Sequence, residues 1–203
     1  MSEPDAITTF RDIVVALSAA TTAVAAVIGL RSWRRQQEWA QDREVARELA
    51  RACIRAHDAF RSARSRMIWS SEFPADWDAT DPDPAAKSRA HAYAYGARFD
   101  RLQDQMNRLE AAALEAEVLW GSDVASAMQR VRVCRSRLFT SIDLYVEELA
   151  TGEVDRRDPA MLRTIHDVHD QGDDDEFTSE IHSSIDALLD FARPHLERRG
   201  WFA

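Results

Sequence analysis

The sequence predicts an all-α protein, in which an N-terminal transmembrane helix continues into an antiparallel four-helix bundle with coiled-coil character. Three observations predict this class. Residues 13–30 form an uncharged run, later apolar residues recur at steps of three and four, and no segment alternates as a strand does. Glycine and proline are scarce, at six each in 203 residues, so the composition favours long helices.

The uncharged run from Ile13 to Leu30 has about the shortest length at which a helix can span a bilayer. Basic and aromatic residues follow it at once, as is typical of a membrane interface. These predicted interface residues are Arg31, Trp33, Arg34 and Arg35. We therefore expect a transmembrane helix over residues 7–30 that anchors the protein in the lipid bilayer.

Two other interpretations of this segment stay open. A cleaved signal peptide would carry net positive charge before the apolar run, but Glu3, Asp5, Arg11 and Asp12 stand there and the arginine cluster comes after the run. A buried helix of a soluble protein is the second alternative. We favour the anchor because the run ends so sharply in arginines.

The distribution of charge sets the expected orientation. Ten arginines and six acidic residues lie between residues 31 and 72, whereas six arginines and thirteen acidic residues lie between 150 and 203. Because positive flanks stay in the cytoplasm, we expect residues 1–6 outside the bacterial inner membrane and residues 31–199 and the tail 200–203 in the cytoplasm. The net charge of −9 argues against nucleic acid as a partner.

The expected span is weakly apolar, since only eight of its eighteen residues are Ile, Leu or Val. Small residues recur in it at a spacing of four, which lets two helices approach closely. The residues of this possible helix–helix contact are Ala16, Ala20, Ala25 and Gly29. We predict a homo-oligomer through this contact, with an unidentified protein partner as the alternative.

The first cytoplasmic helix is expected over about residues 31–71, where no glycine or proline interrupts the pattern. One face carries apolar residues at steps of three and four: Val45, Leu49, Ala52, Ala56, Phe60, Ala63 and Met67. Three prolines and four aspartates between residues 73 and 84 then predict a loop.

The second helix, about residues 85–120, carries a heptad seam that predicts packing against neighbouring helices. The seam consists of Ala92, Tyr95, Phe99, Leu102, Met106, Leu109, Ala113, Ala116 and Trp120. Gly121 ends this helix and Ser122 can cap the next, so a tight turn should produce an antiparallel hairpin.

Three further helices are expected, over about residues 122–150, 159–169 and 176–198. The first carries a stripe of Ala127, Val131, Cys134, Leu138, Ile142, Tyr145 and Leu149. The last carries Phe177, Ile181, Ile185, Leu188, Ala192 and Leu196, and Pro194 should kink or end it. Cys53 and Cys134 lie on apolar stripes, so we expect two buried, reduced thiols.

Histidines and carboxylates crowd between His166 and His182, which raises the question of a cation site. His166 and Asp170 are four apart and share a helix face. The calcium-loop glycine and the Glu-x-x-His pattern of di-iron bundles are both absent from the sequence. We therefore expect a solvated acidic loop that binds no metal, and leave a metal-dependent enzyme as an alternative.

No other motif predicts an enzyme. Arg51 and His57 have the loose R-x(4–6)-H spacing of a class of helical ribonucleases, but six helical positions place them about 240° apart around the axis. The sequence also lacks a P-loop, G-x-S-x-G and H-E-x-x-H. We expect no enzymatic activity and no cofactor.

Three stretches resemble a group of small, uncharacterised bacterial proteins: WRRQQEWAQDREVARELARA (33–52), AYAYGARFDRLQDQMNRLEAAALEAEVLWGSDV (92–124) and GDDDEFTSEIHSSIDALLDFARPHLERR (172–199). The resemblance implies one N-terminal membrane span and a cytoplasmic helical domain, without a known activity. The expected function is thus a non-enzymatic, membrane-anchored bundle that mediates protein–protein interaction or self-assembly. A membrane effector in defence or stress, which acts through oligomerised spans, is the alternative.

Overall fold

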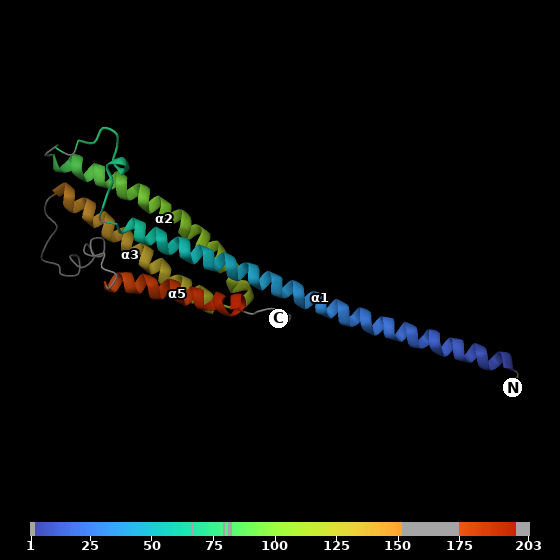
Figure 1. The fold of residues 1–203 in the computed structure, drawn as a ribbon. Coiled ribbons are helices and arrows are strands. Elements are labelled where there is room, and N and C mark those ends of the chain that lie inside the picture. Colours follow the sequence, from blue (N-terminus) through green and yellow to red (C-terminus); the bar gives the residue numbers. More distant parts are fainter. Residues whose placement is uncertain (1–2, 66, 79, 81–82, 152–174, 198–203) are drawn as a thin grey trace. The chain divides into compact units, whose positions relative to one another are not determined.

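The computed structural model describes residues 3–65, 67–78, 80, 83–151 and 175–197, without the side chains of residues 3–9, 11–16, 19, 20 and 23. In these ranges it contains four α-helices and one 3₁₀ turn, and no strand. They are α1 (Glu3–Ala63), η1 (Ser70–Glu72), α2 (Pro84–Trp120), α3 (Asp123–Thr151) and α5 (Glu176–Glu197) (Figure 1). The prediction of an all-α protein is confirmed.

The chain divides into two compact units, Met1–Glu44 and Val45–Ala203. The first unit is the N-terminal part of α1 alone, and its described side chains up to Gln41 are all exposed. Within the part of the chain that the structure describes, no helix is long and apolar enough to cross a membrane. The expected span over residues 7–30 is therefore helical in its backbone but is not supported as a transmembrane helix, and several of its side chains lie outside the described residues.

The second unit is a bundle whose core combines the apolar stripes of α1, α2, α3 and α5. Leu102, Met106 and Leu109 of the predicted seam are fully buried. The stripes of the other three helices also supply the core, through residues that include Leu49, Phe60, Val131, Leu138, Ile185 and Leu188. The bundle is thus held by the residues that the periodicity singled out.

The turn between α2 and α3 forms as predicted. The N–H of Gly121 donates to the carbonyl of Glu117 at 2.9 Å, and Gly121 then adopts a φ of 98°. Side chains with a β-carbon rarely adopt this φ, which accounts for glycine at the end of α2. At the other end, the Asp83 carboxylate accepts from the N–H groups of Ala85 and Ala86 and caps α2.

Three sequence expectations about helix ends and faces were wrong. The helix expected to reach residue 71 ends at Ala63, so Met67 leaves the apolar face and is 61% exposed. Pro194 was expected to kink or end the last helix, and it does not end it, because it lies inside α5 close to the C-terminal end of that helix. Ala92 and Leu196, at the ends of their stripes, are exposed. The helix expected over residues 159–169 lies outside the described residues.

Candidate functional site

The exposed face of α1 in the first unit is one candidate functional surface. Its large apolar side chains are 51–70% exposed, although they are of the kind that folded proteins bury. They are Phe10, Leu17, Val24, Val27, Ile28 and Leu30. We call the part from Leu17 to Leu30 the apolar stretch of α1. Something outside the described chain must cover it if it is to leave water.

The predicted interface and contact residues lie on this same helix. Arg31, Trp33, Arg34 and Arg35 are all exposed, directly after the apolar stretch. Ala25 and Gly29 are also exposed, and a β-carbon added at Gly29 would meet no atom within 4 Å. Ala16 and Ala20 lie outside the described side chains. The small-residue face is therefore open for contact where it is described.

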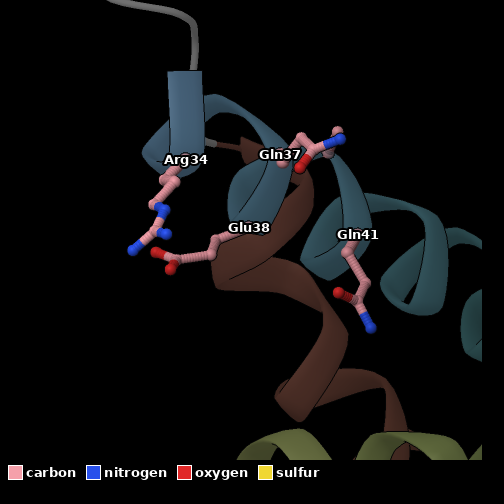
Figure 2. Close-up of a pocket in the computed structure, with 5 residues that line it drawn as sticks. Arg34, Gln37, Glu38 and Gln41 are labelled. Atoms are coloured by element: carbon pink, nitrogen blue, oxygen red, sulfur yellow. The ribbon is translucent and has the colours of Figure 1, made fainter. Parts of the chain in front are cut away.

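A shallow hollow lies one turn further along α1. It is lined by Arg34, Gln37, Glu38, Ala40 and Gln41, which all belong to one stretch of helix (Figure 2). In Figure 2 the side chains of Arg34 and Glu38 extend toward one another, at a spacing that favours oppositely charged pairs. Because every lining residue is exposed, the hollow is a polar stretch of helix surface and has no enclosed wall for a ligand.

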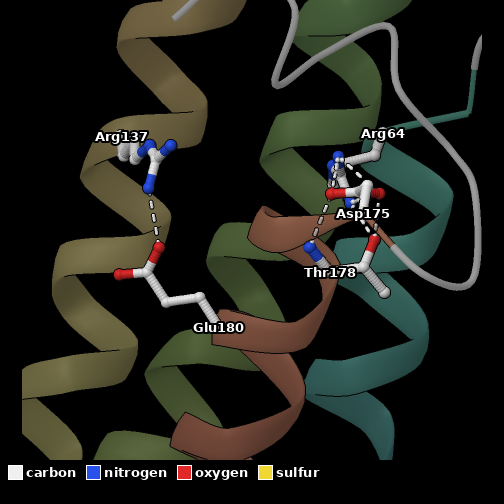
Figure 3. Close-up of polar contacts among 5 residues, drawn as sticks. All are labelled: Arg64, Arg137, Asp175, Thr178 and Glu180. Carbon is white, nitrogen blue, oxygen red and sulfur yellow. Dashed lines mark hydrogen bonds and ion pairs between the residues drawn. The ribbon is translucent and has the colours of Figure 1, made fainter. Parts of the chain in front are cut away.

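In the second unit, two arginines attach the start of α5 to the neighbouring helices. Arg64, just after α1, contacts Asp175 at 3.2 Å and donates to the hydroxyl of Thr178, while Arg137 of α3 donates to Glu180 at 2.6 Å (Figure 3). The ring of Phe177 has both guanidinium groups within 5 Å of its centroid, Arg64 at 4.9 Å and Arg137 at 4.6 Å. This is a cation–π arrangement around a buried ring.

The charge of Asp175 is stabilised by these partners. Burial raises the pKa of its carboxyl group, but hydrogen bonds from Thr178 and Arg64 outweigh burial and leave the pKa below its ordinary value. Asp175 therefore carries negative charge at neutral pH, and α5 begins with a satisfied ion pair. The geometry makes this a structural contact between elements.

A second buried ion pair closes the loop after α1. Arg98 of α2 is 3% exposed in its side chain and contacts Glu72 at 2.6 Å, with a further bond from its Nε at 2.9 Å. The same guanidinium donates to the carbonyls of Ser65 and Met67. Both carbonyls lie just beyond α1, and the Met67 carbonyl also accepts from the Ser65 hydroxyl, so Arg98 ties the chain that follows α1 to α2.

The described part of the acidic segment is occupied by contacts to other helices. Asp175 pairs with Arg64, Glu180 pairs with Arg137, and the Nε2 atom of His182 lies 3.1 Å from that of His57. His166, His169, Asp170, Asp173 and Asp174 lie outside the described residues. Among the residues that the structure does describe, no group of three His, Cys, Asp or Glu side chains is placed to hold a metal ion.

The two cysteines are free and buried, as the sequence predicts. Burial, with a smaller contribution from Asp186, raises the pKa of the Cys53 thiol to about 12. Burial also raises the pKa of the Cys134 thiol, which lies 3.8 Å from the hydroxyl of Ser184. Both are protonated at neutral pH and hence weak nucleophiles, so they serve as core residues.

Sequence reasoning missed the buried arginines and the histidine pair. Arg98 had a detectable signal, because it stands between Tyr95 and Leu102 at helical spacing and therefore on the apolar seam. The contact between His57 and His182 had no sequence signal, since 125 residues separate the two histidines. Comparisons of the chain with protein-family models, with curated proteins and with solved structures found no match.

Proposed function

We propose that the protein is a non-enzymatic helical bundle, held at a bacterial inner membrane by the first part of α1, that binds a protein partner or further copies of itself. The observation that carries the proposal is the exposed apolar stretch of α1 followed at once by exposed Arg31, Trp33, Arg34 and Arg35. Lipid tails cover apolar side chains, and an arginine–tryptophan border suits the headgroup region. The resemblance to small single-span bacterial proteins agrees with this function.

The expected membrane affinity comes from the whole uncharged run from Ile13 to Leu30, of which the structure describes only some side chains. The eight Ile, Leu and Val residues between Ile13 and Leu30 contribute about −2 to −5 kcal/mol to insertion, partly offset by Ser, Thr and Gly. The following arginines favour the cytoplasmic side, which sends the bundle there and the N-terminus outside. Such a marginal span gains stability from neighbouring helices.

The membrane proposal predicts that charge inside the stretch releases the protein. In cells that express the full chain, we expect wild type in the membrane fraction after a carbonate wash. Val24→Arg combined with Val27→Arg should shift most of it to the supernatant, because each central arginine costs about 2.5–3.5 kcal/mol. Gln37→Arg with Gln41→Arg adds the same charge outside the stretch and should leave the protein in the membrane. A Val24/Val27 variant that still resists carbonate would contradict the proposal.

Self-association through the small-residue face is the proposed use of the anchor. Ala25 and Gly29 are four apart and lie on one face, and both are open for a second helix. Closed two-fold pairing is the commonest outcome of such contacts. The bundles of the two copies would then lie on the same side of the membrane.

Oxidative cross-linking in isolated membranes tests this contact. We expect single cysteines at Ala25 or Gly29 to give a covalent dimer, and cysteines at Val24 or Val27 to give several-fold less, because these point to other faces. The native thiols can stay, since Cys53 and Cys134 are buried. Equal cross-linking at all four positions, or none, would mean that the protein needs a different partner.

A further inference from the structure

Two histidines that are 125 residues apart meet between α1 and α5. The Nε2 atoms of His57 and His182 are 3.1 Å apart, and their ring centroids are 4.4 Å apart at an interplanar angle of 61°. The His57 side chain is 28% exposed and His182 is exposed, so the pair lies at the bundle surface, where water and ions reach it. The two rings are presented by rigid helices.

Two carboxylates, Asp58 and Asp186, lie on the helices close to the pair. The Oδ1 atom of Asp58 lies 3.7 Å from Nδ1 of His57, on the side of the ring away from His182. Asp186 follows His182 by one helical turn, and its charge also acts on Cys53, one turn before His57. In the described part of the chain, the polar partners of the two imidazoles are each other and, for His57, the Asp58 carboxylate.

We propose that His57 and His182 form an interhelical binding site for a divalent transition metal of the Zn²⁺ class. Two imidazole nitrogens that bind one tetrahedral Zn²⁺ at about 2.0–2.1 Å are about 3.3 Å apart, close to the separation present here. Small rotations of the two rings turn both lone pairs toward one ion. Water fills the remaining positions, because the described residues offer no cluster of three ligands.

Asp58 is the positioning residue of this site. A metal-bound histidine commonly directs its other ring N–H toward a carboxylate, which fixes the tautomer and raises the basicity of the ligand nitrogen. Asp58 stands on the Nδ1 side of His57 and leaves Nε2 for the metal. The ion would connect α1 to α5 and so stabilise the docking of the last helix. This inference is independent of the membrane proposal.

The test is a Zn²⁺ titration of the full chain, purified in detergent without a histidine tag. We expect one Zn²⁺ per chain by calorimetry and a rise in Tm of about 2–5 °C at saturation. Mg²⁺ and Ca²⁺ should have no effect, because imidazole suits transition metals. Binding should weaken as the pH falls from about 7.5 to about 5.5, since protons compete for the nitrogens.

Variants locate the ion. His57→Gln and His182→Gln should each weaken Zn²⁺ binding at least tenfold, and Asp58→Asn should weaken it less. His195→Gln on the same helix and His166→Gln with His169→Gln in the acidic segment should leave it unchanged. Circular dichroism without metal verifies that each variant is folded. The proposal is overturned if wild type binds no Zn²⁺ at about 100 µM, or if binding survives both single variants. Loss in the His166/His169 variant alone would move the site to the acidic segment and also overturn it.

Discussion

Replacing Arg98 by methionine should lower the free energy of unfolding by about 3–5 kcal/mol, the largest single-residue effect that we expect in the bundle. The Arg98 side chain is 3% exposed and contacts the Glu72 carboxylate and the carbonyls of Ser65 and Met67. Methionine keeps the apolar volume but leaves a carboxylate without its partner in a largely buried place. Urea unfolding of the full chain in detergent measures the change.

A matched control and a pH series identify the cause. Arg108→Met replaces an exposed arginine on the same helix and should change stability by less than about 0.5 kcal/mol. The Arg98 hydrogen bond holds the pKa of Glu72 below its ordinary value of 4.5. A carboxyl group whose pKa is lowered in the folded state stabilises the fold at pH values above its ordinary pKa. This stabilisation is lost as the pH falls through the lowered pKa. The difference between wild type and Arg98→Met should therefore shrink below about pH 4.5, and a difference that is constant with pH would contradict the ion-pair account.

The long helices were predictable because their apolar residues recur with helical period over many turns. Leu102, Met106 and Leu109 stand in such a seam and are fully buried. The α2–α3 turn was predictable for a local reason, since Gly121 supplies a φ of 98° that other residues rarely adopt. Local rules suffice for both features.

The end of α1 was not predictable from local rules. Residues 64–71 contain no glycine or proline, yet the helix stops at Ala63. A tertiary contact holds the chain just beyond this end, where Arg98, distant in sequence, donates to the carbonyls of Ser65 and Met67. Such a contact outweighs the small helix propensities of a few residues.

The candidate sites divide in the same way. Arg31, Trp33, Arg34 and Arg35 were named from the sequence because a charge boundary is visible along the chain. The His57–His182 pair was not, because only the packing of α5 against α1 brings the rings within 3.1 Å. His57 attracted attention only through its spacing from Arg51, and Arg51 instead contacts Glu48.

Deletion of residues 1–30 should change the location of the protein completely, which is the second large effect that we expect. Val45–Ala203 is a compact unit with its own core, so the shortened chain should fold. The shortened chain lacks the apolar stretch of α1 and should therefore no longer bind the membrane. Its circular dichroism should remain that of a helical protein, and its Tm should match that of the full chain, because residues 1–30 lie outside the compact unit.

Flotation of cell membranes on a sucrose gradient, after a high-salt wash, measures this most directly because it separates membrane-bound protein from aggregates. We expect the full chain to float with the membranes and the chain of residues 31–203 to stay at the bottom as folded protein. A full chain that salt releases, or a 31–203 chain that floats equally well, would contradict the claim that the first part of α1 holds the bundle at the membrane.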